Sequence, residues 1–367
     1  MIEILLGVVT GFLIGLVPGL HVNTLLPALS PDYYFIVPLS IAFVFSSFFP
    51  SLLLGVPNAE TALSVLPGHR LVLRGRAITA LLLCFYSAMI ASALSLFSLL
   101  ILFSVVKPLF SSFKPIVPFI LAAVILSFVL KNKKAAIIVA LSSALGLATF
   151  KNEGLLMPIL SGFFALSTLM LSFGTSKLTP QSAEFSPKIT PMQLVRASLA
   201  ASLLSCFFSL VPAVSSSIAA TAGTALGKMN DEEFMAFVSA TNTSYMILSF
   251  YTMSVLGIFR SGSAALLSQA PPPNVLQIAG IVLVSSFFAG MLCIALAPVF
   301  TRLYRRVNYR QSCVFSIAFI ISLNALFTGF YGLLVLFAAS AVSVSTRFLN
   351  VARVTCMSAL MAPIVLL

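Results

Sequence analysis

The sequence predicts an all-α integral membrane protein: a polytopic chain of two inverted repeats with broken or re-entrant helices and about 10–12 membrane segments. Three observations predict this fold class. Of the 367 residues, 60% are hydrophobic and only 8% are charged, whereas soluble domains carry roughly 25% charged residues. Broken apolar motifs recur in the same order in both halves of the chain. Basic residues gather in short loops, as in multi-pass proteins of the cell membrane.

A Leu-Val-Pro motif stands at 16–18 and returns at 210–212, inside apolar runs that would otherwise be continuous helices. Proline removes a backbone donor and the glycine after the first copy loosens the helix, so both runs are expected to break. Polar side chains at such a break are tolerated in hydrocarbon only inside protein or beside a polar cavity. The candidate substrate-binding residues at these two breaks are Pro18, Gly19, His21, Asn23, Thr24, Ser215, Ser216 and Ser217.

A second break follows in each half, at Leu-Gly-Val-Pro (54–57) and Leu-Gly-Ile-Phe (256–259). The first copy leads into Glu60 and the second into Arg260. Ionisable residues inside a membrane are functional by default, and Glu60 suits a cation or proton. Arg260 suits a carboxylate or phosphate, although a snorkelling interfacial arginine is nearly as good an explanation. The other candidates near this motif, including one on the preceding helix, are Asn58, Thr61, Asn242 and Ser261.

Each candidate also has a purely structural interpretation. His21 suits an anionic substrate or a proton relay, but it would also fit as a satisfied histidine between helices. The hydroxyl and amide side chains suit sodium or substrate, yet for any single one helix packing is the better explanation. The acidic cluster 231–233 is typical of a helix start or a solvated loop rather than a metal site. The five scattered cysteines are interpreted as small buried hydrophobes.

In chain order, we expect a first repeat at 1–175, a linker at 176–191 and a second repeat at 192–367. The linker is the longest polar stretch and contains three prolines. The segments expected in the first repeat are a broken hairpin at 4–30, a long run at 33–54, and spans at 77–106, 115–130, 135–150 and 155–175. Those expected in the second are a broken run at 194–227, segments at 235–257 and 275–301, and three short spans separated at 328–329 and 347–353.

The distribution of Lys and Arg predicts an orientation. Loops at 70–76, 131–134, 177–188 and 302–310 hold most of the basic residues and are expected in the cytoplasm. The first broken hairpin would then enter the membrane from outside and the second from inside, which inverts the two halves. The net charge of +12 is explained by this topology and does not indicate a nucleic-acid partner.

The pieces at 16–21, 54–62 and 74–77 resemble the large permease subunit of tripartite tricarboxylate transporters. The pieces at 210–214 and 256–262 look like degenerate copies of that family's repeated motifs. The second Pro-Gly of the family is Pro-Ala here, and its second Gly-Ile-Pro-Gly is Gly-Ile-Phe-Arg. The chain is shorter than the bacterial permeases and looks most like their compact archaeal relatives.

The resemblance implies a secondary-active permease for a small organic anion, a carboxylate, driven by a Na⁺ or H⁺ gradient. It also implies a small membrane subunit and an extracytoplasmic binding protein as partners. The alternative is a translocase for a phosphorylated lipid carrier, whose anionic head would use the same breaks. An enzyme is disfavoured because no nucleotide-binding loop, metal-ligand spacing or nucleophile elbow occurs. We expect no catalytic residue, no metal site and no cofactor besides the coupling ion, and a homo-oligomer remains an open alternative.

Overall fold

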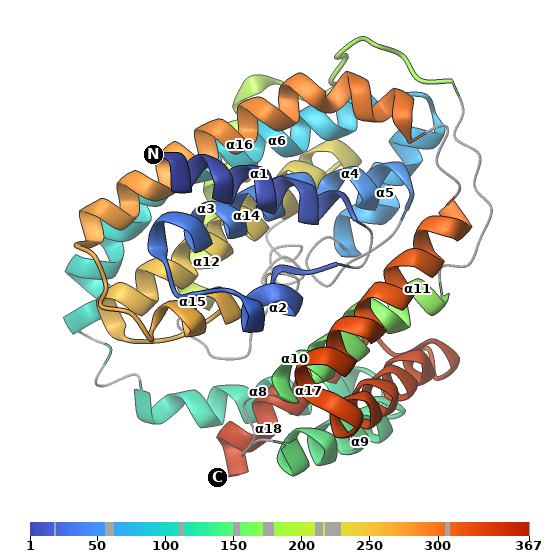
Figure 1. Ribbon diagram of the computed structural model, residues 1–367. Coiled ribbons are helices and arrows are strands. Elements are labelled where there is room, and N and C mark those ends of the chain that lie inside the picture. The colour runs from blue at the N-terminus through green and yellow to red at the C-terminus, as the bar shows by residue number, and fades with distance from the viewer. Residues whose placement is uncertain are drawn as a thin grey trace.

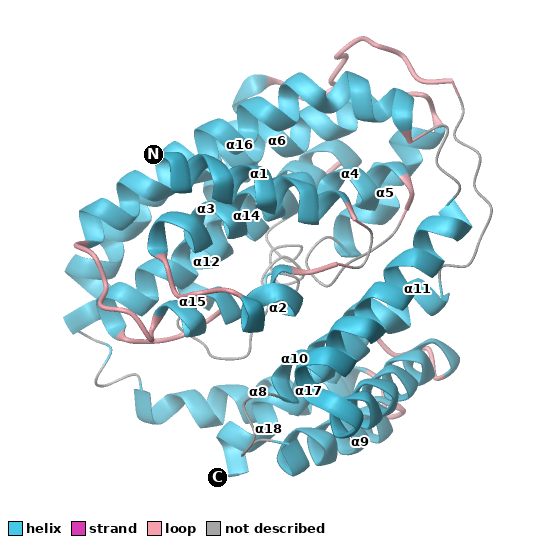
Figure 2. Ribbon diagram, in the orientation of Figure 1, coloured by secondary structure: helices cyan, strands magenta, loops and turns pink. Residues whose placement is uncertain are grey.

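The computed structural model describes residues 1–17, 20–55, 62–108, 110, 114–149, 155–171, 180–209, 216, 229–304 and 309–366. Across these residues the chain forms helices and connecting loops, with no strand (Figure 1 and Figure 2). The helical fraction is 84%. The all-α class predicted from the sequence is therefore confirmed.

Within the described residues, five helices are long and apolar enough to cross a membrane. They are Tyr33–Leu53, Ala77–Ile101, Pro191–Phe208, Val275–Leu303 and Cys313–Phe348. Shorter apolar helices of 10–17 residues are Ile2–Leu16, Pro118–Lys131, Ala135–Thr149, Met157–Leu171 and Arg353–Leu366. The chain is therefore a multi-pass membrane protein, as predicted.

The helices gather into a larger and a smaller bundle (Figure 1). The larger bundle is centred on α3 (Tyr33–Ser46) and α4 (Phe48–Leu53), where every residue from 36 to 53 is buried. The surrounding helices are α1 (Ile2–Leu16), α5 (Ala62–Leu73), α6 (Ala77–Ile101), α12 (Pro191–Phe208), α14 (Asp231–Leu256), α15 (Gly262–Leu267) and α16 (Val275–Leu303). Two short elements, α2 (Val22–Leu25) and η1 (Leu26–Ala28), connect α1 to α3.

Glycine allows α1 to approach α3 very closely. Gly7, Gly11 and Gly15 are spaced four residues apart and are all buried on one face of α1. A Cβ atom on Gly11 would overlap the backbone carbonyl of Leu39, and one on Gly15 would overlap the hydroxyl of Ser46. In a membrane, small residues at this spacing let two helices pack by van der Waals contact where lipid offers no hydrophobic driving force.

The smaller bundle contains the helices between α6 and the linker together with the C-terminal helices. Its core includes Phe163, Val335, Ala339 and Ala359, and the hydroxyl of Ser343 donates to the Phe163 carbonyl at 2.5 Å. Its main helices are α8 (Val117–Lys131), α9 (Ala135–Thr149), α10 (Leu156–Leu160), α11 (Ser167–Leu171), α17 (Tyr309–Phe348) and α18 (Ser358–Leu366). Short connecting elements are η2 (Leu102–Val106), η3 (Lys114–Ile116), η5 (Ser161–Leu166) and η7 (Arg353–Met357).

Each half of the sequence contributes to both bundles, and within the larger bundle the packing is reciprocal. Helix α3 of the first half packs on α16 of the second, and α14 of the second packs on α6 of the first. In the same way α1 packs on α3 and α12 packs on α14. Reciprocal packing is expected of two structurally related halves. The repeat boundaries and the inverted orientation of the halves stay predictions.

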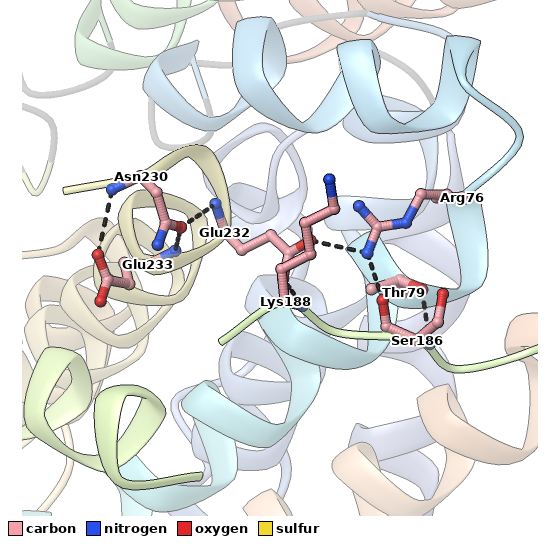
Figure 3. A network of polar contacts seen from close by, with 7 residues as sticks. All are labelled: Arg76, Thr79, Ser186, Lys188, Asn230, Glu232 and Glu233. Carbon is pink, nitrogen blue, oxygen red and sulfur yellow. Dashed lines mark hydrogen bonds and ion pairs between the residues drawn. The ribbon is translucent and has the colours of Figure 1, made fainter. Parts of the chain in front are cut away.

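The linker strap, residues 180–190, ties the start of α6 to the start of α14 (Figure 3). Arg76 forms an ion pair with Glu232, Nη2 to Oε1, at 2.8 Å and also donates to the carbonyl of Ser186. The other carboxylate oxygen of Glu232 accepts the backbone N–H of Lys188 at 2.6 Å. Asn230 caps α14 through a capping box with Glu233, so the acidic cluster is a helix start, one of the two interpretations favoured above a metal site.

Candidate substrate site

The first predicted break separates α1 from α2. Helix α1 ends at Leu16, Val17 is extended, and helical backbone resumes at Val22. His21 caps the new helix, because its Nδ1 accepts the backbone N–H of Asn23 at 3.1 Å. The imidazole packs edge-on against Phe43 of α3, with the ring centroids 4.8 Å apart. The predicted break near Pro18 is therefore confirmed by the residues on either side of it, Leu16 and Val22.

The second break of the second half separates α14 from α15. Gly257 ends α14 in the left-handed conformation, φ 68°, and its N–H donates to the carbonyl of Met253 at 3.0 Å. Ser261 then caps α15 by accepting the N–H of Ala264 at 3.1 Å. The Ser261 hydroxyl also lies 3.0 Å from the hydroxyl of Ser249 on α14. This break is confirmed as well.

These two breaks, far apart in the sequence, lie directly against each other. A Cβ atom on Gly262 would stand only 2.6 Å from the Oδ1 of Asn23, so α15 meets α2 where glycine leaves room. Next to it, the hydroxyl of Ser40 on α3 donates to that of Ser263 at 2.7 Å. The structure therefore brings His21 and Asn23 of the first half together with Ser261 of the second.

Arg260 lies in the connection between α14 and α15. Its Nε and Nη1 atoms are buried and, within the described residues, have no hydrogen-bond partner. Tyr245 of α14 is close enough to interact with it electrostatically. A snorkelling arginine would keep its charged head in water, and a guanidinium with two of its three nitrogens buried does not fit that description. Arg260 is thus a fork of donors held beside the two breaks.

Asn242 lies in a buried polar stretch of α14 that runs from 239 to 244. Several of its neighbours serve helix packing. The Ser244 hydroxyl lies 2.9 Å from that of Ser202 on α12, and the Ser239 hydroxyl donates to the Cys84 carbonyl of α6 at 2.7 Å. The packing interpretation therefore holds for Ser239 and Ser244, while Asn242 remains a candidate.

The other candidates are placed only in part. Ser216 is buried, and Thr24 belongs to α2. The candidates that lie outside the described residues are Pro18, Gly19, Asn58, Glu60, Thr61, Ser215 and Ser217. Across the described part of the chain, no three His, Cys, Asp or Glu side chains gather as a metal site. All five cysteines are free and buried, which confirms their interpretation as buried hydrophobes.

Sequence reasoning missed Tyr245 and Ser249, which line the same side of α14 as Asn242. Tyr245 and Ser249 stand three and seven residues after Asn242, a spacing that places all three on one helix face. That polar face was a usable signal. Ser40 could not be found in this way, because it is one of many serines in apolar runs and only the fold brings it to Ser263.

Comparison with known proteins adds three findings. Residues 1–358 match the model of the tripartite tricarboxylate transporter TctA family. An uncharacterized protein of Methanocaldococcus jannaschii is 28% identical over 343 residues, covering 87% of this chain and 85% of that protein. No solved structure matches the chain.

Proposed function

Because the chain belongs to the tripartite tricarboxylate transporter TctA family, we propose that it is a secondary-active permease for a small organic carboxylate, driven by a Na⁺ or H⁺ gradient. The family comprises transporters, and the apolar helices make this member a multi-pass protein of the cell membrane. We further propose a small membrane subunit and an extracytoplasmic binding protein as its partners.

The observation that supports a carboxylate substrate is the buried guanidinium of Arg260. Its Nε and Nη1 have no hydrogen-bond partner among the described residues, and charged donors buried in a membrane protein without acceptors are costly. A carboxylate can accept two parallel N–H bonds from guanidinium, which compensates both charge and hydrogen bonding. An anionic substrate would therefore stabilise this arrangement.

The neighbouring side chains are uncharged and can form hydrogen bonds with a substrate. Asn23 offers an amide at the junction of α2 and α15, and Ser249 and Ser261 offer hydroxyls one step away. In transporters, substrates bind at broken helices of this kind, near the interface of related halves. We propose that Arg260 sets the requirement for negative charge and that Asn23, Ser249 and Ser261 orient the substrate. Glu60 stays a candidate for the coupling cation.

The test is uptake by purified protein in liposomes, with labelled mono-, di- and tricarboxylates and an inward gradient of either Na⁺ or H⁺. At least one carboxylate should accumulate, and an ionophore that collapses the driving gradient should abolish accumulation. Protein-free liposomes provide the background. Transbilayer movement of a phosphorylated isoprenoid lipid without uptake of any carboxylate would contradict the proposal and favour the lipid translocase.

A further inference from the structure

Asn324 is a buried amide on a helix that is otherwise largely exposed and apolar. Between 313 and 327, the buried positions of α17 are Cys313, Ser316, Ile320 and Asn324, which form one narrow stripe. Asn324 is 0% exposed. Two of the four buried positions, Ser316 and Asn324, are therefore polar, so this stripe faces protein and not lipid.

The carbonyl oxygen of the Asn324 side chain has no partner among the described residues. Its Nδ2 donates to the Ile320 carbonyl at 2.8 Å, and its backbone carbonyl accepts the hydroxyl of Thr328 at 2.6 Å. With the amide nitrogen held in this way, Oδ1 is left as a buried acceptor. Leaving such a group without a partner is unfavourable, so a ligand is expected there.

The Oδ1 atom of Asn324 carries partial negative charge, and the helix backbone close to it also favours a positively charged ligand. Gly329 interrupts α17 with φ 64° and ψ −161°, a conformation that only glycine adopts easily. The helix before it therefore ends at this point, and the carbonyls of its last turn lose their usual N–H partners. The C-terminal end of a helix carries partial negative charge and favours a cation.

We infer that Asn324 Oδ1 is a ligand for Na⁺, at a site between α17 and the larger bundle. Helix α17 also packs against α2, which carries Asn23, so the helix that would hold the ion contacts an element of the candidate substrate site (Figure 1). Amide and backbone carbonyl oxygens are ligands that hard cations prefer. A carboxamide does not titrate, so this site selects Na⁺ over H⁺. The inference rests on the proposed function, because it identifies the coupling ion.

The test measures Na⁺ binding by the purified, substrate-free protein. Its melting temperature is followed as NaCl replaces choline chloride at constant ionic strength. The wild type should melt at higher temperature as Na⁺ rises. Asn324→Leu, which keeps the volume but removes the oxygen, should weaken the apparent Na⁺ affinity by about tenfold or more. Asn324→Asp, which keeps an oxygen, should retain the response.

Ser316→Ala is the matched control, because Ser316 is equally buried and its hydroxyl also lacks a partner in the described residues. It lies eight residues earlier, about 12 Å along the helix, and its change should alter Na⁺ affinity by no more than about twofold.

An absent Na⁺ response in the wild type would overturn the inference. So would an unchanged response in folded Asn324→Leu, or an equal loss in Ser316→Ala. If Asn324→Leu does not fold, loss of the response in folded Asn324→Asp would also overturn it. Because no carboxylate is present, failure of the proposed transport would leave this result unaffected.

Discussion

At the scale of single residues, close approach determines which side chains the structure tolerates. Gly11 lets α1 rest on the backbone of α3 at Leu39, and Gly262 lets α15 rest on Asn23 of α2. Gly280 on α16 differs, because it is exposed and a Cβ atom there would meet nothing within 4 Å. The same residue type therefore has opposite consequences at these positions.

Gly11→Ala should destabilise the protein by about 1–3 kcal/mol, because the new methyl group overlaps a backbone carbonyl that cannot rotate away. Gly280→Ala is the control and should leave stability unchanged or raise it by up to about 1 kcal/mol, since alanine favours the helix. Melting temperatures of the two variants in one detergent make the comparison. Equal melting temperatures would show that α1 does not pack on α3 as described.

At the scale of elements, a buried ion pair fastens the linker strap to two helices. Arg76 and Glu232 have side chains that are 18% and 5% exposed, whereas the adjacent pair, Arg70 and Asp231, is 55% and 39% exposed. Buried charges that lose their partner are expensive, and exposed pairs contribute little. The two neighbouring acids at the start of α14 therefore differ in importance.

Glu232→Ala should lower stability by about 3–5 kcal/mol, because it leaves Arg76 without its partner and the Lys188 N–H without its acceptor. Asp231→Ala should cost no more than about 1 kcal/mol. Limited proteolysis of the strap, read together with the melting temperature, would measure both effects. A similar loss of stability in the two variants would contradict the conclusion that the Arg76–Glu232 ion pair holds the strap in place.

At the scale of the whole molecule, the start of α6 beside Arg76 and the end of α16 at Arg302 lie at one end of the larger bundle. The ring of Phe49 is 5.3 Å from that of Phe85 near the start of α6, and 4.9 Å from that of Phe300 near the end of α16. The two helices therefore begin and end at the same level. This arrangement agrees with the positive-inside placement of both loops.

Cysteines introduced at Arg74 and Arg302, in a variant whose five native cysteines are replaced, should react with a membrane-impermeant reagent from the same side. That side should be the cytoplasm. Both positions are exposed at their helix ends. Labelling of the two positions from opposite faces would rule out this topology and the inverted orientation of the halves.

Much of the fold follows from local chemistry. Glycine and proline interrupt apolar runs, so the breaks after Leu16 and Leu256 are predictable, and so is the interruption of α17 at Gly329. Which helices gather in which bundle could not be predicted, because an apolar helix surface is almost equally stable against lipid and against another helix. Asn324 was missed for the same reason, since a single amide in an apolar run gives no period and no motif.

The central claim is that the buried guanidinium of Arg260 receives the carboxylate of the substrate. Titration calorimetry of purified protein with the carboxylate that it transports tests this most directly. Arg260→Gln should weaken binding by about 10- to 100-fold, as expected for the loss of a hydrogen bond to a charged group. Arg260→Lys should bind at intermediate strength, because it keeps the charge but not the fork. Arg302→Gln, at an exposed arginine, should bind like the wild type. Unchanged binding by folded Arg260→Gln would contradict the account.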